Sequence, residues 1–313
     1  MTQSMTQSMS QGSGSAPSNG TRYRVSHQTR YVYASEVVHA HQALHLTPRS
    51  LPQQSCDQHQ LTISPLASNS QTDIDAFGNP VTRLEFDWPH TELTVLAEMT
   101  VTVAPPRQVQ FESSDGWEQV RDNLAYHPNE RSPEQLEAIR YRMQSPYVPL
   151  KNIFLDFAND CFTPGQPIAS CALALSNKLH RTLTYTPGGT EIDTPLLKIL
   201  AERRGVCQDY AHLMIACLRA RGLAARYVSG YLRTTSSLDA PKLVGADASH
   251  AWVSVYAPSL GWIDLDPTNG LIVGKDHITL AWGRDFGDVS PLRGVIVGGG
   301  THTLEVAVSV IEQ

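Results

Sequence analysis

The order in which hydrophobic patterns change along the chain limits the folds that it can adopt. From Tyr23 to about Val103, apolar residues alternate in short runs separated by turn sequences such as DAFGNP, and this pattern predicts antiparallel strands. Helical spacing follows, and alternating strands return in the last third of the chain. Because helices and strands are grouped rather than alternating, the pattern argues against a βαβ sheet and indicates an α+β fold.

The same changes divide the chain into segments. We predict a disordered tail over 1–21, an N-terminal antiparallel β domain over 22–106, a helical connecting segment over 107–165, a core over 166–280, and a C-terminal loop with a closing strand over 281–313. The tail is rich in Ser, Gln and Gly, a composition that cannot bury apolar surface. It lacks the basic start and apolar centre of a secretory signal, so we expect a cytoplasmic protein.

Composition argues against several classes of protein. The formal net charge is -6 with acids and bases interleaved, which gives no electrostatic reason to expect binding to nucleic acid or to a membrane surface. No apolar run reaches the roughly 18 residues of a membrane-spanning helix. The five cysteines are irregularly spaced without a C-x-x-C pair, so we expect reduced thiols, no metal and no cofactor. The oligomeric state stays open.

One cysteine stands where a helix is predicted to begin. In RRGVCQDYAHL (203–213) Gly205 is expected to end the preceding helix, and Cys207 opens an apolar helical run that stops at Gly222. The first turn of a helix carries a positive partial charge and unpaired N–H groups, which favour a thiolate over a thiol. The same N–H groups can stabilise an oxyanion. Cys207 is therefore a candidate nucleophile, against the alternative that it packs beneath the glycine turn.

A nucleophilic cysteine needs a base, and the nearest histidine in sequence is a poor candidate. His212 lies five positions after Cys207, which turns its side chain about 140° away around the helix. Asp209 and His212 are three residues apart and therefore neighbours on one face. We interpret them mainly as a pair that supports the helix, with a role behind the site as the alternative.

A better base lies on a predicted hairpin. His250 stands on the strand SHAWVSVYA, and WIDLDPT returns after a turn over 258–261. With the hairpin centred near residue 258, His250 faces Asp266 on the same side of the sheet, where a carboxylate can hold an imidazole N–H. A slip of two residues would offer Asp264 instead. Cysteine, histidine and aspartate in this order indicate a thiol-based catalytic triad.

The blocks that carry these residues resemble a known family. RRGVCQDYAHL, YVSGYL, SHAWVSVY and GWIDLDPTNG, which together cover roughly residues 182–270, are similar in order and character to the core of the transglutaminase-like superfamily. YRVSHQTRYVY, LHLTPR and DAFGNPVTRLEF resemble the β domain that precedes this core in a bacterial branch, and GRDFGDVSPLRG resembles the C-terminal end of that branch. The resemblance implies that the segment over 166–280 is a papain-like cysteine proteinase core.

The resemblance also implies a chemistry. Cys207 would be the nucleophile, His250 the general base and acid, and Asp266, next to Pro-Thr, the residue that orients His250. The implied reaction is acyl transfer from a peptide or protein amide through a thioester. We expect water as the acceptor, as in a cysteine protease or amidase. The alternatives are an amine-accepting transglutaminase and a non-enzymatic interaction module on the same fold.

Three further features receive weaker interpretations. Tyr185, in LTYTPGGT, is a candidate second oxyanion donor or pocket wall, with packing as the favoured alternative. Arg284 and Asp285 could approach a substrate, but an Arg-Asp pair in a loop is more often structural. The chain has no D-x-D-x-D-G loop, so calcium dependence is not expected.

Overall fold

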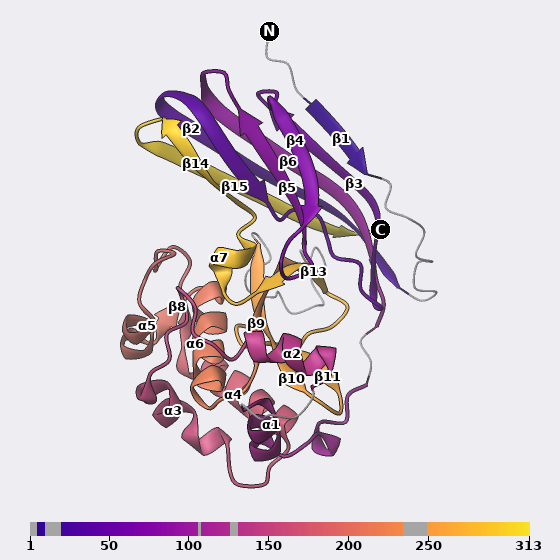
Figure 1. Ribbon diagram of the computed structural model, residues 1–313, viewed down its shortest axis with the longest axis vertical. Helices are drawn as coiled ribbons and strands as arrows, with labels where there is room; N and C mark the ends of the chain where they lie inside the picture. The colour runs from indigo at the N-terminus through magenta and orange to yellow at the C-terminus, as the bar shows by residue number, and fades with distance from the viewer. Residues whose placement is uncertain (1–4, 10–19, 106–107, 126–130, 234–248) are drawn as a thin grey trace.

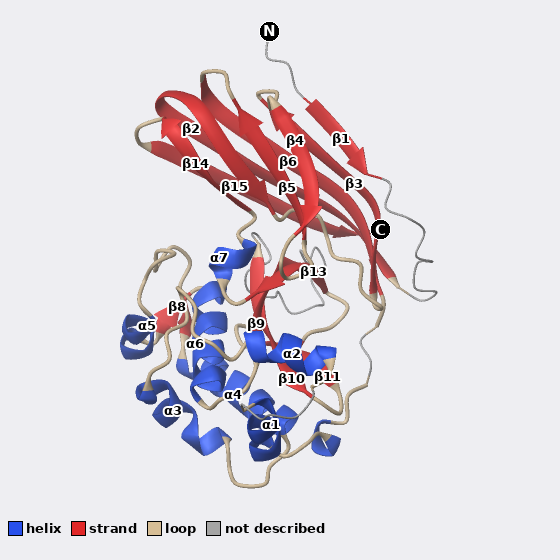
Figure 2. Cartoon of the chain, in the orientation of Figure 1, coloured by secondary structure: helices blue, strands red, loops and turns tan. Residues whose placement is uncertain are grey.

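The computed structural model describes residues 5–9, 20–105, 108–125, 131–233 and 249–313. A β domain lies at one end of the molecule and a mixed α/β body at the other (Figures 1 and 2). No helix among the described residues is long and apolar enough to cross a membrane. The predicted α+β class is confirmed, with an antiparallel β domain preceding the core.

The β domain is one antiparallel sheet. The strands that the first third of the chain contributes are β1 (Met5–Met9), β2 (Thr21–Leu44), β3 (Gln54–Ser64), β4 (Asn69–Ile74), β5 (Pro80–Phe86) and β6 (His90–Val103). The strand order in the described residues is β1-β3-β6-β2-β5-β4. β2 continues through an irregularity between Val32 and Val37, and beyond it β5 replaces β6 as its partner.

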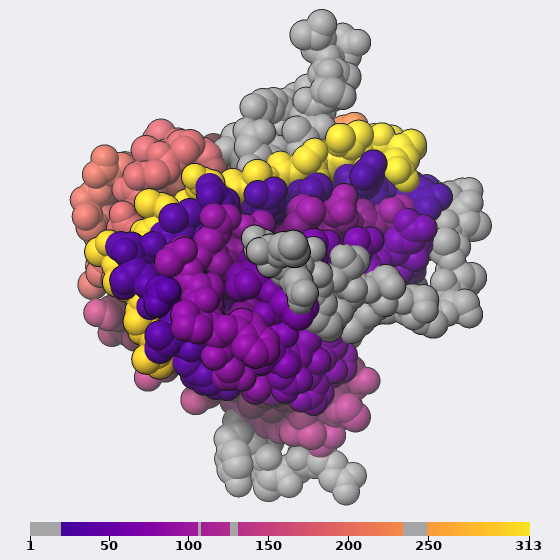
Figure 3. Space-filling model, turned by 90° about the horizontal axis from the view of Figure 1, so that it is seen from above, coloured from indigo at the N-terminus to yellow at the C-terminus, as the bar shows by residue number. Residues whose placement is uncertain are grey.

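The chain returns to this sheet at its C-terminus. β14 (Leu292–Gly298) and β15 (His302–Glu312) both pair antiparallel with β2, and the yellow C-terminal segment runs along indigo β2 in Figure 3. We expected the closing strand to belong to the second half of the protein, and that expectation was wrong. The long β2 offers a free edge over nearly its whole length, so two successive strands can pair with it.

Part of the N-terminal tail also belongs to the sheet. Met5–Met9 form β1, paired with β3 from Met5 opposite Ile63 to Met9 opposite His59. Our expectation of a disordered tail is therefore wrong for these residues. An edge strand presents unpaired N–H and C=O groups that accept another strand with little regard to its side chains. The rest of the predicted tail, apart from Gly20, lies outside the described residues.

The second body packs helices against a smaller sheet. Its helices are α1 (Trp117–Leu124), α2 (Pro133–Arg140), α3 (Asn152–Ala158), α4 (Ile168–Thr182), α5 (Leu196–Glu202), α6 (Cys207–Ala220) and α7 (Phe286–Val289), with short 3-10 turns η1 (Phe111–Ser113) and η2 (Asn159–Cys161). The strands β9 (Ala225–Leu232), β10 (His250–Ala257), β11 (Gly261–Asp266), β12 (Leu271–Ile272) and β13 (His277–Gly283) form an antiparallel sheet in the order β12-β11-β10-β9-β13. α6 is buried along most of its length and packs on β10 and β9.

The two bodies are joined through the edge strand β13. Gln54 of the β domain donates its amide to the carbonyl of Thr279 (2.7 Å) and accepts from the N–H of Thr279 (2.8 Å). Asn79 makes the same pair of bonds with Trp282, at 2.9 and 3.0 Å. A register irregularity separates these two positions of β13. Two side-chain amides therefore take the place of a neighbouring strand.

Candidate active site

The start of α6 is held by a side chain three residues into the helix. Asp209 Oδ2 accepts from the N–H of Val206 (2.8 Å) and from Thr190 Oγ1 (2.7 Å). Burial raises the pKa of Asp209, against the effect of these two donors. A Cβ on Gly205 would lie 2.7 Å from the Asp209 side chain, so this glycine makes room for the cap. The preceding helix ends instead at Arg203, the left-handed residue (φ 54°).

Cys207 is the first residue of α6, as predicted, and it is partly exposed. Val206, the residue that precedes it, has no side-chain acceptor for the first N–H groups of the helix. The N–H groups of Asp209 and Tyr210 donate to the carbonyl of Val206, which leaves those of Cys207 and Gln208 as candidate donors to an oxygen placed next to the thiol. The position combines access for a substrate with local donors.

His250 and Asp266 meet in a fully buried pair. His250 Nε2 lies 2.8 Å from Asp266 Oδ2, and neither side chain is exposed. Burial lowers the pKa of His250, but the charge and hydrogen bond of Asp266, together with Cys207, outweigh burial and raise this pKa to about 10. For Asp266, burial acts to raise the pKa, and the two histidines beside it lower it well below the usual value.

Nδ1, the other ring nitrogen of His250, takes no part in the hydrogen bond to Asp266. Because an ionised carboxylate only accepts, Nε2 carries the proton that is donated to Asp266. Nδ1 is buried without a hydrogen-bond partner among the described residues, and Cys207 is near enough to His250 to help raise its pKa. The structure thus brings Cys207, His250 and Asp266 together in the order expected of nucleophile, base and orienting carboxylate.

The hairpin register differs from the prediction by one step. Ala257 pairs with Gly261 and Val253 with Leu265, which places the centre at residue 259 rather than 258. Asp266 consequently stands opposite Trp252 and reaches His250 diagonally. A shift of the centre by one residue moves each pairing by two, so both side chains stay on the same face. Asp264, the alternative candidate, lies opposite Ser254, farther along the hairpin from His250.

Several donors converge on Asp266. Oδ1 accepts from the N–H groups of Thr268 (3.0 Å) and Asn269 (3.2 Å), and Oδ2 accepts from Asn269 Nδ2 (2.8 Å). His277 Nε2 also lies 3.2 Å from Oδ2. Sequence reasoning missed His277, since it begins a separate strand and no spacing rule connects it to the hairpin. Its presence in KDHITLAWG as a polar residue opening an apolar strand was the available signal.

Gly230 makes room for the aromatic wall behind the base. It pairs with His250 across β9 and β10, and a Cβ there would lie 2.2 Å from the carbonyl oxygen of Ile278 and 2.3 Å from the Trp252 ring. Trp252 in turn packs edge-on against His277, with ring centroids 5.3 Å apart. The glycine of YVSGYL therefore sets the position of side chains that surround His250.

Asp209 and His212 have separate partners, so each supports α6 through its own contacts rather than through a contact with the other. His212 Nε2 accepts from the N–H of Phe286 (3.1 Å), and its ring stacks on Tyr147 with centroids 5.6 Å apart. Burial, with a smaller effect of Arg219, lowers the pKa of His212 to about 3. His212 therefore joins α6 to the start of α7.

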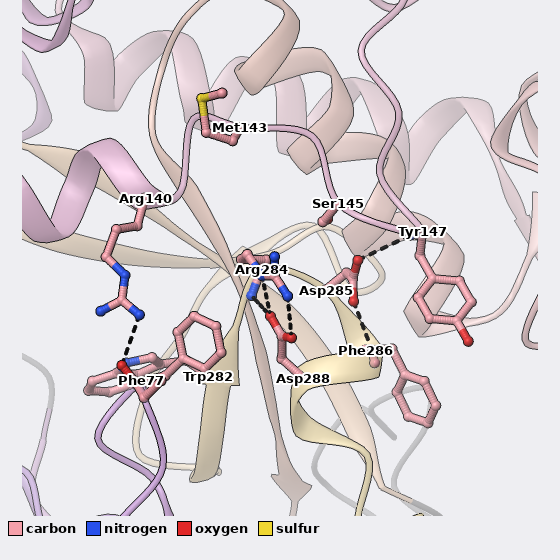
Figure 4. Close-up of polar contacts among 12 residues, drawn as sticks. Phe77, Arg140, Met143, Ser145, Tyr147, Trp282, Arg284, Asp285, Phe286 and Asp288 are labelled. Atoms are coloured by element: carbon pink, nitrogen blue, oxygen red, sulfur yellow. Dashed lines mark hydrogen bonds and ion pairs between the residues drawn. The ribbon is translucent and has the colours of Figure 1, made fainter.

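The Arg284 and Asp285 side chains have structural partners (Figure 4). Arg284 makes a two-pronged ion pair with Asp288, with both N–O distances 2.9 Å. Asp285 caps α7 through the N–H of Gly287 (2.9 Å) and accepts from the N–H of Tyr147 (3.0 Å). The structural interpretation of this segment accounts for both residues.

Tyr185 lies close to the start of α6 in the chain fold. It forms the short strand β7 (Thr184–Tyr185), which pairs in parallel with β8 (Arg204–Gly205), so that Tyr185 stands opposite Gly205. Gly205 precedes Cys207 by two residues, so the backbone of Tyr185 lies beside the segment that leads into α6. A role as oxyanion donor or pocket wall stays a prediction.

One cluster of metal-ligating side chains occurs in the described part of the chain: His250, Asp266 and His277, whose ligating atoms lie within 4.8 Å of one another. Hydrogen bonds already join these atoms. The absence of a metal stays a prediction.

The fold, an antiparallel β domain followed by an α+β core with a buried His-Asp pair and a helix-terminal cysteine, defines the class of protein. Residues 23–102 match the bacterial transglutaminase-like N-terminal region, and residues 156–267 match the transglutaminase-like superfamily. The chain belongs to the transglutaminase-like superfamily and carries its bacterial N-terminal region.

Two relatives that align with nearly the whole chain are described as uncharacterised proteins. Uncharacterised proteins of Mycobacterium tuberculosis and Mycobacterium leprae are 36% and 33% identical to this chain over 95% and 92% of its length, and over 95% and 98% of their own. A solved structure from Cytophaga hutchinsonii, described as a candidate cysteine protease, is 20% identical with a TM-score of 0.70, over 98% of this chain and 93% of its own. That similarity shows the fold. A protein-glutamine gamma-glutamyltransferase of Pseudomonas aeruginosa is 36% identical over 33% of this chain and 16% of its own length.

Proposed function

We propose that this protein is a thiol-dependent acyl-transfer enzyme acting on amide or peptide bonds. The observation that carries the proposal is the buried 2.8 Å hydrogen bond between His250 and Asp266, with Cys207 at the start of α6 near enough to His250 to affect its pKa. A nucleophile, a base and an orienting carboxylate in mutual contact form the arrangement that acyl transfer requires. The full burial of the His250–Asp266 pair also shields it from water, which strengthens its electrostatic interaction.

The first half-reaction forms a thioester. Cys207 Sγ attacks the carbonyl carbon of the substrate amide, and N–H groups at the start of α6 donate hydrogen bonds to the developing oxyanion. The C–N bond then breaks, and the imidazolium of His250 gives its proton to the departing nitrogen, which leaves as ammonia or an amine. Asp266 holds His250 in the tautomer that keeps Nδ1 toward the thiol throughout.

The second half-reaction returns the enzyme. His250 removes a proton from the acceptor, the acceptor attacks the thioester carbonyl, and the C–S bond breaks to restore the thiolate. Water as the acceptor gives a carboxylic acid, and an amine gives a new amide. We propose water, so that the protein acts as a cysteine protease or amidase. A cytoplasmic location and a peptide or protein substrate are parts of the same proposal.

Trapping of the acyl-enzyme tests this function. Glutamine-containing peptides and intact proteins are each incubated with the enzyme as substrates. The peptide that contains Cys207 is then examined by mass spectrometry for a thioester adduct. Fluorescent amine is then added to compare incorporation with hydrolysis. We expect an adduct on Cys207 that water releases, no adduct in Cys207→Ala, and an unchanged adduct in Cys56→Ser, which removes another partly exposed thiol.

Each other outcome identifies an alternative. Incorporation of the amine in preference to hydrolysis would make the protein a transglutaminase. Turnover that persists in Cys207→Ala would contradict the thiol mechanism. A folded protein that forms no adduct with any substrate, and whose Cys207 reacts no faster than Cys56, would favour the interaction module.

A further inference from the structure

His277 shares an acceptor atom with the proposed base. His250 Nε2 and His277 Nε2 lie 2.8 and 3.2 Å from the same oxygen, Asp266 Oδ2. Both histidine side chains are buried, at 0% and 2% exposure. His277 comes from β13, the strand on the opposite side of β9 from β10. The fold therefore brings two imidazoles from separate strands to one carboxylate.

The neighbouring backbone sets the tautomer of His277. The N–H of Gly274 lies 3.5 Å from His277 Nδ1, and a backbone N–H can only donate. Nδ1 is then the acceptor of the ring, and Nε2 carries the proton that faces Asp266. A neutral His277 is thus preset as a hydrogen-bond donor to the carboxylate.

Three donors on one oxygen must divide its charge. Oδ2 accepts from His250, from His277 and from Asn269 Nδ2, although a carboxylate oxygen offers only two lone-pair sites. The backbone N–H groups of Thr268 and Asn269 hold Oδ1. The carboxylate therefore stays anchored when one donor to Oδ2 is lost, and the remaining donors are bound more strongly.

We propose that His277 is a positioning residue that weakens the hold of Asp266 on the His250 proton by donating to the same oxygen. In the proposed acyl transfer, on which this inference rests, His250 must give its proton to the leaving nitrogen. A carboxylate shared with a second donor stabilises the imidazolium less than an unshared one. His277 thereby favours the general-acid step without touching substrate.

Other titratable groups face this cluster from neighbouring elements. Cys207 approaches His250 from α6, and Asp264 on β11 interacts electrostatically with His277. Asp276, next to His277 in the chain, is bonded instead to Arg233 (2.8 Å) and to Tyr23 (3.4 Å). A measured change in the titration midpoint of His250 is therefore attributed to His277 only by comparing variants at His277 itself.

The titration of His250 tests the inference directly. The full-length protein is labelled with 13C at histidine Cε1, and the His250 NMR signal is assigned by its loss in His250→Gln. His277→Phe keeps a ring against Trp252 but removes the donor, whereas His277→Gln restores an N–H near the same place. We expect His277→Phe to raise the midpoint of His250 by at least about half a pH unit, and His277→Gln to stay close to wild type.

Coupling through Asp266 provides the second measurement. In an Asp266→Asn background the shared charge is gone, so His277→Phe should no longer move the His250 midpoint. An unchanged or lower midpoint in His277→Phe, or an equal shift in the Gln variant, would overturn the inference. If the Phe variant does not fold, His277→Leu is compared with His277→Gln under the same criteria.

The proposed function is tested separately by the rate at which iodoacetamide labels Cys207. A rate that is equal in wild type and His250→Gln would contradict the role of His250 as base, whatever His277 does. If the labelling rate depends on His250 but the His250 titration midpoint does not change in the His277 variants, only the present inference is rejected.

Discussion

Asn79 and Trp282 exchange two hydrogen bonds across the boundary between the β domain and the core. The amide oxygen of Asn79 accepts from the N–H of Trp282, and its Nδ2 donates to the carbonyl of the same residue. Arg49 also binds Asn79 Oδ1 (2.6 Å) and covers the Trp282 ring at 3.5 Å. The β domain is thereby fixed to the edge of the sheet that carries His250.

Removal of this amide should destabilise the whole protein. We expect Asn79→Ala to lower the free energy of unfolding by about 1–3 kcal/mol, because it leaves a backbone N–H and a carbonyl of β13 without their partner. Urea denaturation measures the change, and Asn69→Ala, which removes an exposed amide of the same domain, serves as the control. Equal stability of the two variants would contradict a joining role for Asn79.

A side chain at Gly230 should disturb the site from within. We expect Gly230→Ala to lower stability by about 1–3 kcal/mol through overpacking against Ile278 and Trp252, and to slow alkylation of Cys207 by displacing the surroundings of His250. Gly116→Ala is the control, since a Cβ there meets its first neighbour at 3.9 Å. Thermal unfolding and labelling kinetics give the two readouts. Wild-type behaviour of Gly230→Ala in both assays would show that the Trp252 ring can move freely.

The charge of Asp266 should set the alkaline limit of activity. His250 has its pKa raised to about 10, so its imidazolium is retained below that value and lost as pH rises through it. Asp266→Asn removes the main raising influence while burial continues to lower the pKa. The alkaline limb of the pH–rate profile should therefore move to lower pH, with a loss of about 10²–10⁴-fold in rate. The profile is measured by substrate turnover, and an unmoved limb would contradict the role of the carboxylate.

The five thiols should differ sharply in reactivity near neutral pH. Burial raises the pKa of Cys56 to about 12 and that of Cys171 to about 11, and it also raises the pKa of Cys161 and Cys217. We expect one equivalent of iodoacetamide to react first, at Cys207, and peptide mass spectrometry to locate it. Cys207→Ser should lose this rapid phase. Rapid labelling of Cys56 at a similar rate would refute the predicted selectivity.

The sequence predicted the local features of the site better than its long-range contacts. Cys207 at the start of a helix follows from the glycine turn and apolar spacing, and the shared face of His250 and Asp266 follows from strand parity alone. The hairpin centre did not follow, because Gly261, with its positive φ (80°), already pairs with Ala257 and so centres the turn on residue 259. When the hairpin centre shifts by one residue, side chains that share a face still share it, but each residue then lies directly opposite a different partner.

Contacts that depend on the whole fold had no local signal. His277 reaches Asp266 only because β13 joins β9 on the side away from β10. Hydrophobic periodicity predicts strands but not their order in a sheet. In the same way, Gln54 and Asn79 look like ordinary turn or loop amides until β13 is placed beside them. The C-terminal strands alternate like any others, and their pairing with β2 rather than β13 was decided by the long free edge of β2.

The return of β14 and β15 to β2 gives the molecule the topology of a domain insertion. Both ends of the described chain belong to one sheet, and the helices together with the smaller sheet are carried between β6 and β14 as a guest within that host. The outer sheet is completed only after the core has been synthesised, since β14 and β15 follow the core in the chain. Folding of the outer sheet during synthesis must therefore wait for, or be remodelled after, the segment that contains Cys207, His250 and Asp266.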